Sequence, residues 1–278
     1  MRVVNETGSL PAISAPAGAV FPEAAAGGFL GIVMLDTRFP RPPGDVGHPA
    51  TFGVPTRQLV VPGAFPREVV ATAQALRSSG LVARFVAAVR QLEAEGARAI
   101  TTSCGFLVLL QAELQAAARV PVVTSSLLQL PALLAREARV GVLTISATNL
   151  GHEHLLAAGV PAHRLQDVVV QGMDPAGAFA KPILGNEVEM DLAAAEADVA
   201  ASARTLRARA PDVRDVVLEC TNLPPYARAV QTATGWRLFS LADEPALTGW
   251  AANRRPREGG DPGGGGRQRP PGFPPARE

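Results

Sequence analysis

Several features that would point to common functions are scarce in this sequence. Its 278 residues include a single lysine, Lys181, and the formal net charge at pH 7 is only +1. Residues 253–278 hold six arginines and three acidic residues, so the 252 residues before them carry about −2. A chain body without excess positive charge lacks the electrostatic pattern of nucleic-acid binding. We therefore expect no nucleic-acid partner.

Long apolar runs and common cofactor motifs are also missing. No stretch of roughly 18 apolar residues is present, so we expect no membrane-spanning helix. Residues 1–27 contain two glutamates and three prolines and do not resemble a signal peptide, so we expect a cytoplasmic protein. The absence of a Walker loop, a G-x-G-x-x-G and a Cys-x-x-Cys leaves nucleotide and zinc sites without support. His152 and His154 do not share a helical face. We expect neither a cofactor nor a metal.

Only two cysteines occur, Cys104 and Cys220. Because we expect no secretory signal, we expect them to be thiols rather than a disulfide. Each follows an apolar strand pattern and precedes a turn and a helical pattern. A thiol at that place faces backbone N–H groups and the positive end of the helix dipole, which favours the thiolate. Either cysteine alone could be a small buried apolar residue, but their matching settings favour a shared chemical role.

Strand and helix patterns alternate along the whole chain. Strands are expected at Gly28–Leu35, Arg57–Pro62, before Cys104, and at Val120–Thr124, Arg139–Ile145, Asp167–Gln171, before Cys220, and at Trp236–Leu241. Helices are expected at Pro66–Glu95 with a break near Gly80, after Cys104, and at Leu127–Glu137, from Thr148 to about Ala157, Glu187–Arg209 and Pro224–Ala233. Such alternation requires crossover helices and mostly parallel sheets.

A weak internal similarity divides the chain into two halves. The segment Gly31–Thr37 resembles Gly141–Thr148, and the distances from these glycines to the following cysteine are 73 and 79 residues. We therefore expect an α/β fold of two similar lobes, each with a mostly parallel sheet flanked by helices, and an active site in the cleft between them. The expected division is a loose leader at 1–27, a first lobe at 28–122 rejoined by about 240–252, a second lobe at 123–239, and a disordered Gly/Pro/Arg tail at 253–278.

Four short motifs in this order resemble the aspartate/glutamate/hydantoin racemase superfamily, over roughly residues 28–250. They are Asp36-Thr37 after the first strand, Thr-Thr-Ser-Cys104, Thr148 after a Gly-Val-Leu strand, and Glu-Cys220-Thr-Asn. The resemblance implies a cofactor-independent enzyme of two α/β lobes. It also implies that Cys104 and Cys220 are the two acid/base cysteines, and that Asp36, Thr37, Thr148 and Thr221 hold or polarise the substrate.

Four further residues are candidates for substrate binding. The Ser103 hydroxyl could stabilise a carbanionic intermediate, and Gly105 would let backbone N–H groups approach a ligand closely. Arg38 could pair with a substrate carboxylate or be a solvated loop residue. Asn222 stands where amino-acid racemases usually have histidine. Asp36, for its part, could simply cap its loop by accepting backbone N–H bonds.

Two opposed thiols suit inversion of an acidic C–H centre, because one thiolate removes the proton and the other thiol returns one to the far face. We therefore expect a PLP-independent racemase or epimerase acting on a small carboxylate or hydantoin-type substrate. Gly105-Phe106 stands where many members of the family have a polar pair after the first cysteine, so hydantoins rank ahead of glutamate. Helical spacing favours the core for Phe106, and a ring turned toward the cleft is the alternative.

Other functions stay open at this stage. They are a maleate-type cis-trans isomerase, a decarboxylase, and a non-catalytic two-lobed binding protein that uses the Pro/Gly-rich segment 39–55 as a lid. The expected partner is a small molecule, and the sequence leaves a homo-oligomer open.

Overall fold

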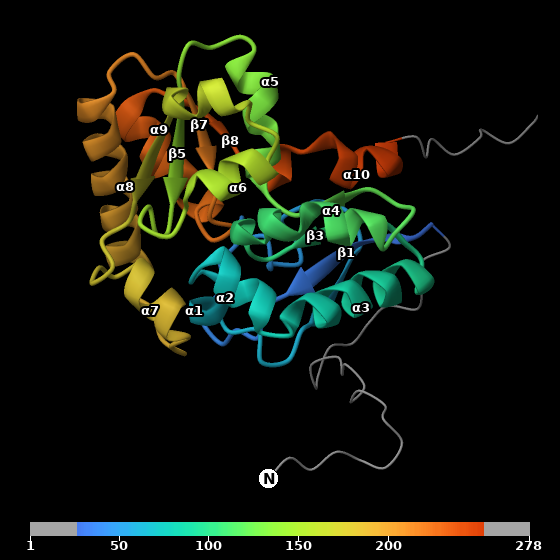
Figure 1. The fold of residues 1–278 in the computed structure, drawn as a ribbon. Helices are drawn as coiled ribbons and strands as arrows, with labels where there is room; N and C mark the ends of the chain where they lie inside the picture. The colour runs from blue at the N-terminus through green and yellow to red at the C-terminus, as the bar shows by residue number, and fades with distance from the viewer. Residues whose placement is uncertain (1–26, 253–278) are drawn as a thin grey trace, which may run out of the picture.

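The computed structural model describes residues 27–252 and consists of two α/β lobes (Figure 1). The leader expected at 1–27, apart from Gly27, and the tail expected at 253–278 lie outside the described residues. Each lobe is built on a four-stranded parallel sheet, and the two sheets have the same strand order. The expected two-lobed α/β architecture is confirmed.

The first sheet has the order β2-β1-β3-β4. Its strands are β1 (Phe29–Met34), β2 (Thr56–Val60), β3 (Ala97–Thr102) and β4 (Val122–Val123). All six residues of β1 are buried, as expected of a central strand covered on both faces. Helices α1 (Pro66–Val69), α2 (Ala73–Ser78) and α3 (Leu81–Ala94) connect β2 to β3. The expected break near Gly80 is present, because Gly80 takes a left-handed conformation with φ 75° immediately before α3.

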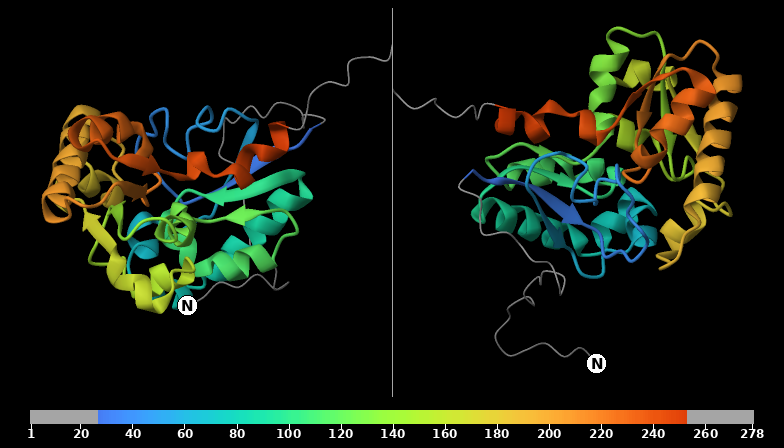
Figure 2. Two further views of the ribbon diagram at one scale, coloured as in Figure 1. Left: turned by 90° about the horizontal axis from the view of Figure 1, so that it is seen from above. Right: turned by 180° about the vertical axis from the view of Figure 1, so that it is seen from behind.

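Two helices far apart in the chain, α3 and α10 (Pro245–Ala252), cover the two faces of the first sheet. Phe29 and Val33 of β1 belong to the same buried cluster as the apolar face of α3. The alternate residues Leu30 and Ile32 point the other way and share a cluster with Leu247 of α10. The last helix therefore packs beside β3 in the first lobe, as both views show (Figures 1 and 2).

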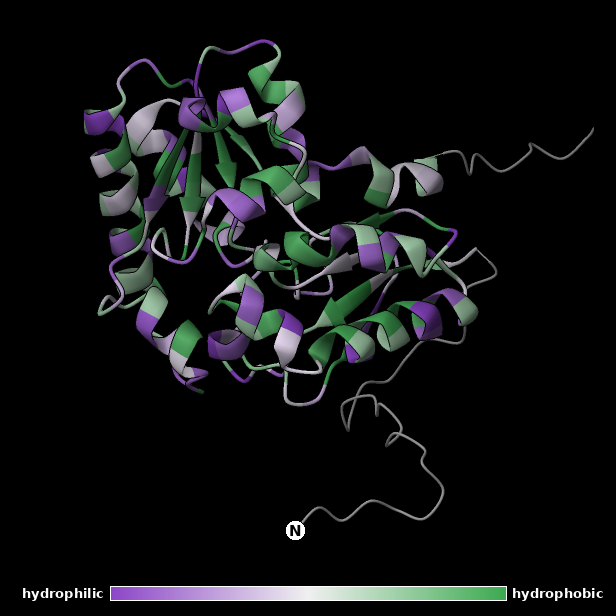
Figure 3. Cartoon of the chain, viewed as in Figure 1, coloured by the Kyte–Doolittle hydropathy of each residue, from purple (hydrophilic) through white to green (hydrophobic). Residues whose placement is uncertain are grey.

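The second sheet has the order β6-β5-β7-β8. Its strands are β5 (Val140–Thr144), β6 (Val168–Gly172), β7 (Asp215–Leu218) and β8 (Arg237–Phe239). Its helices are α5 (Leu130–Leu134), α6 (His152–Ala157), α7 (Ala180–Gly185), α8 (Leu192–Arg209) and α9 (Ala227–Thr234). Apolar residues gather on the strands of both sheets, whereas polar residues appear mainly on the outer helices (Figure 3).

Three local expectations need correction. Helix α8 begins at Leu192 and not at Glu187, because Asp191 caps it by accepting hydrogen bonds from the N–H groups of Ala193 and Ala194. Val188, which lies in the expected helix range, precedes the helix and is 62% exposed. The connection after β6 is not all loop, since it contains α7.

The third correction concerns the segment after Cys104. It starts as a 3₁₀ helix, η1 (Gly105–Leu110), and becomes the α-helix α4 (Gln111–Ala116) only afterwards. All six residues of η1 are buried, so the tight turn is held by packing from every side.

Candidate active site

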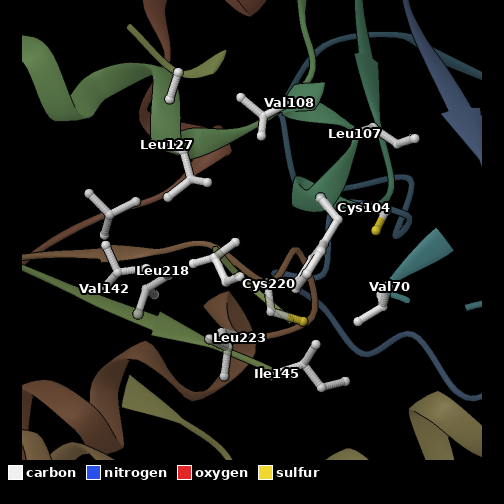
Figure 4. Packing of buried hydrophobic residues seen from close by; sticks show 14 of the residues in the cluster. Val70, Cys104, Leu107, Val108, Leu127, Val142, Ile145, Leu218, Cys220 and Leu223 are labelled. Carbon is white, nitrogen blue, oxygen red and sulfur yellow. The ribbon is translucent and has the colours of Figure 1, made fainter. Parts of the chain in front are cut away.

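The two cysteines occupy equivalent places in the two lobes and line one cavity. Cys104 follows β3, and Cys220 follows β7, which holds the same position in the second sheet. Both side chains are buried, with 7% and 6% of their surface exposed. The cavity they share is small, about 20 Å³, and is also lined by Val70 and Ile145, one from each lobe. Both sulfur atoms lie on the side of the packed cluster near these two side chains (Figure 4).

Hydrogen bonds hold the two strand ends together. The Thr221 hydroxyl donates to the carbonyl oxygen of Ser103 at 2.7 Å, and the N–H of Val46 donates to the carbonyl oxygen of Thr221 at 3.2 Å. The first bond joins the residue after Cys220 directly to the residue before Cys104, and the second joins it to the loop between β1 and β2. Both bonds tie the strand end that carries Cys220 to the first lobe.

Five of the expected substrate-binding residues line this cavity: Thr37, Ser103, Gly105, Thr221 and Asn222. The Thr37 hydroxyl accepts a hydrogen bond from Nη2 of Arg41 at 2.9 Å, and the Ser103 hydroxyl accepts one from the N–H of Leu35 at 2.9 Å. Since a hydroxyl has one hydrogen to donate, both retain a donor for a ligand.

The other three expected binding residues do not line the cavity. Asp36 accepts a hydrogen bond from the N–H of Gly63 at 2.9 Å, which is the loop-capping alternative. Arg38 is exposed. Its backbone N–H donates a hydrogen bond to Oδ1 of Asn186 at 2.7 Å, and its Nη2 donates one to the carbonyl oxygen of Asn186 at 3.1 Å. Thr148 is exposed beyond the end of β5, and the threonine near the site is Thr144.

Phe106 is buried in the core, as its helical spacing predicts. Its ring meets the His154 ring edge-on, with centroids 5.0 Å apart, and the residue also lines the cavity. His154 is buried as well and accepts from the N–H of Gly151 through Nδ1, and its burial lowers its pKa. Within residues 27–252, no three His, Cys, Asp or Glu side chains cluster as metal ligands would.

The sequence analysis missed the most unusual group of the cavity, Glu219. This carboxyl is completely buried; its Oε2 accepts a hydrogen bond from the Thr144 hydroxyl at 2.6 Å, and its Oε1 has no hydrogen-bond partner among the described residues. Burial raises its pKa to about 7. The available signal was its position, an acidic residue at the end of an apolar strand and directly before Cys220.

Both thiols are harder to ionise than expected. Burial, and next the charge of Glu219, raise the pKa of Cys104 to about 12, although the backbone N–H groups of Phe106 and Leu107 act in the opposite direction. The same two causes raise the pKa of Cys220 well above its ordinary value. The expectation that the helix start favours the thiolate is therefore wrong in this structure, because desolvation outweighs the N–H groups.

A second group that the sequence analysis missed comes from the loop at 39–55. Asp45 is buried, forms a salt bridge with Arg41 at 2.7 Å, and accepts a hydrogen bond from Nδ2 of Asn222 at 2.6 Å. The proline- and glycine-rich composition of this loop gave no sign that one of its carboxylates reaches the second lobe.

Comparison with known proteins agrees with this architecture. Residues 60–244 match the family described as Asp/Glu/Hydantoin racemase. A mutant of arylmalonate decarboxylase shares the fold with a TM-score of 0.52 and 17% identity, covering 83% of this chain and 97% of that one. A glutamate racemase isoform from Bacillus anthracis has a TM-score of 0.50 and 14% identity, covering 81% of each chain.

Curated relatives are more similar in sequence. The chain is 32% identical over 217 residues to a dimethylsulfoniopropionate lyase from Durusdinium sp. clade D, covering 76% of this chain and 70% of that protein. It is also 32% identical to dimethylsulfoniopropionate lyase 6 from Emiliania huxleyi, again over 76% of this chain but only 56% of the relative's length. None of the helices between residues 27 and 252 has the length and apolar content needed to cross a bilayer. By its matched domain, its paired cysteine-bearing lobes and these relatives, the chain belongs to the Asp/Glu/hydantoin racemase family.

Proposed function

We propose that this chain is a lyase that cleaves dimethylsulfoniopropionate, or a close analogue, into dimethyl sulfide and acrylate. The observation that carries the proposal is the pair of thiols on one buried cavity, because such a site is suited to removing a proton next to a carboxylate. The names of the relatives favour elimination over inversion as the fate of the resulting carbanion.

The proposed reaction uses a single base. The positive sulfonium of the bound substrate offsets the burial that raises the pKa of Cys104, so the thiol can ionise. The Cys104 thiolate then takes a proton from the carbon next to the carboxylate, and the electron pair of that C–H bond forms the C=C double bond. The C–S bond to the sulfonium then breaks, and dimethyl sulfide leaves with the bonding pair. The proton on Cys104 returns to water, and acrylate remains. A positioned base of this kind contributes roughly 10²- to 10⁴-fold in rate.

Two hydroxyls are placed to hold the substrate carboxylate. Thr37 and Ser103 line the cavity, and each already accepts a hydrogen bond from the protein, so each can donate its own hydrogen. Negative charge moves onto the carboxylate as the proton leaves, so fixed donors there stabilise the transition state more than the ground state.

The sulfonium group suits the carboxyl of Glu219. A buried carboxyl with one unpartnered oxygen is costly to ionise, but a fixed positive charge beside it offsets that cost. Once the cation leaves as neutral dimethyl sulfide, the charge that Glu219 stabilised is gone. The cavity lining therefore offers hydrogen-bond donors, the hydroxyls of Thr37 and Ser103, for the substrate carboxylate, and the carboxyl of Glu219 for the sulfonium.

The test is an assay of the full chain with dimethylsulfoniopropionate, in which dimethyl sulfide is measured in the headspace and acrylate by chromatography. We expect equal amounts of both, and a loss of about 10²-fold or more in the Cys104→Ala variant. Thr148→Ala is the control, because Thr148 is exposed and outside the cavity lining, and it should retain full activity. Release of dimethyl sulfide no faster than in buffer would refute the proposal.

Two-base racemisation is the second candidate, favoured by the presence of a thiol in each lobe. It predicts that deuterium from the solvent enters the α-position of aspartate, glutamate or a 5-substituted hydantoin. Conversion of maleate into fumarate without such exchange would instead indicate a cis-trans isomerase.

A further inference from the structure

We propose that Asp45, acting through Asn222, holds Cys220 as the neutral thiol, so that the two cysteines have fixed and not exchangeable roles. Cys104 is then the base, and Asp45 and Asn222 are positioning residues. The inference deepens the proposed function, because it names which thiol takes the substrate proton. The two thiols are distinguished by the hydrogen-bonding groups around them.

A chain of hydrogen bonds runs from Cys220 into the first lobe. The Cys220 thiol donates to Oδ1 of Asn222 with an S···O distance of 3.6 Å, and Nδ2 of Asn222 donates to Oδ2 of Asp45 at 2.6 Å. Asp45 belongs to the loop between β1 and β2, 177 residues away in sequence, and only 1% of it is exposed. The contact exists only because the loop folds onto the second lobe.

The partners of Asp45 fix the orientation of the Asn222 amide. Oδ1 of Asp45 accepts hydrogen bonds from Nη1 of Arg41 and from the N–H of Gly47, both at 2.7 Å. A carboxylate paired with a guanidinium is an acceptor only, so Asn222 must turn its NH₂ group toward Asp45. Its carbonyl oxygen then faces the sulfur. An acceptor beside a thiol stabilises the S–H form and disfavours the thiolate.

Cys104 shares with Cys220 the burial and the charge of Glu219, which disfavour a thiolate, but its other neighbours differ. The backbone N–H groups of Phe106 and Leu107 and the positive charge of Arg41 all act to lower the pKa of Cys104. Donors stabilise a thiolate in the same way as acceptors stabilise a thiol. If one of the two thiols in the cavity ionises, the negative charge is therefore favoured on Cys104 rather than on Cys220.

Four other titratable groups of the described residues oppose a thiolate on Cys220, and the cation Arg41 is paired with one of them, Asp45. They are Glu219 at the end of β7, Cys104 from the first lobe, Asp45 from the loop, and Tyr226 of η4 (Pro224–Tyr226). Each of these is negative when ionised and opposes a thiolate on Cys220. One donor opposes them, the N–H of Asn222 itself.

Fixed roles fit elimination better than racemisation. A racemase that acts on both enantiomers must use either thiolate as the base, whereas an elimination needs one base only. A site that keeps one thiol protonated is therefore consistent with the proposed lyase.

The test measures the thiol directly and needs no substrate. In a Cys104→Ser background, Cys220 is the only cysteine, and its alkylation by iodoacetamide is followed against pH. Adding Asp45→Asn should lower the midpoint of the rate by about one pH unit or more, which is about a tenfold faster reaction at fixed pH. The amide at 45 can donate to Oδ1 of Asn222, so the Asn222 NH₂ group turns toward the sulfur, and a negative charge is also removed.

Two controls separate this effect from others. Asp212→Asn makes the same chemical change at an exposed surface residue and should not move the midpoint. Opening of the loop would instead speed alkylation equally at every pH, and would also speed it for Cys104 in a Cys220→Ser background.

Asn222→Ala, which removes the acceptor but keeps the backbone N–H, should lower the midpoint as Asp45→Asn does. An unchanged or higher midpoint in both variants would overturn the inference. If the midpoint falls but the parent chain releases no dimethyl sulfide, the inference holds and the proposed function fails.

Discussion

Replacing Glu219 by glutamine should remove a large pH dependence from the stability of this protein. Burial raises the pKa of the folded-state carboxyl from its ordinary value of 4.5 to about 7. Ionising it inside the folded protein therefore costs about 3 kcal/mol relative to the unfolded chain, since each pH unit corresponds to roughly 1.4 kcal/mol. Glutamine has a similar shape, can accept the Thr144 hydrogen bond, and carries no titratable group.

The sign follows from proton binding. Between about pH 4.5 and about pH 7 the folded state keeps the Glu219 proton while the unfolded state loses it, so stability falls as the pH rises. Below this window the cost is absent, and above it the cost is complete. His154 acts in the opposite direction, because its lowered pKa makes the folded state more stable as the pH rises through the same region. Measurements on the parent protein alone therefore cannot separate the contribution of Glu219 from that of His154.

The difference between parent and Glu219→Gln isolates the carboxyl, because His154 contributes equally to both. Urea unfolding at about pH 4 and about pH 8 should show the variant gaining about 3 kcal/mol relative to the parent between the two conditions. A thermal scan would report the same trend as about 6 to 12 °C in Tm. A difference that stays constant with pH would refute the reasoning, since it would mean that Glu219 is ionised at low pH or reached by water.

Two further predictions concern the stability lost on replacing residues in tight or strained places. Gly105→Ala should lower the free energy of unfolding by about 1–3 kcal/mol and reduce activity, because a Cβ there would overlap the carboxyl and backbone oxygens of Glu219. Thermal unfolding measures the loss, and Gly249→Ala is the matched control, because Gly249 has open space around it. Asn186→Ala should lower the free energy of unfolding by about 2–3 kcal/mol, because Asn186 has φ 53° and forms hydrogen bonds with Asp36 and Arg38 across the lobes. Glycine tolerates that φ, so Asn186→Gly should lose about 1–2 kcal/mol less in urea unfolding. Equal losses in both Asn186 variants would show that the backbone conformation contributes nothing.

Much of the architecture could be read from local patterns. The alternation of apolar strands with amphipathic helices predicts a parallel sheet because parallel strands need crossovers, and both sheets are parallel. The two cysteines follow strands β3 and β7 as expected, since an apolar run followed by small and polar residues marks a strand end. Local pattern was less reliable at element starts, where Asp191 and not the apolar periodicity decides where α8 begins.

The α/β class, the two-lobed architecture and the strand-end positions of Cys104 and Cys220 follow from local sequence patterns, because these features depend on residues close together in the chain. The packing of distant segments leaves Thr148 exposed while it encloses Glu219, and it brings Asp45 to Asn222 across 177 residues. The same packing raises the pKa values of both thiols. Burial and charge around a titratable group are set by whatever segments pack against it, and no local pattern encodes which segments those are.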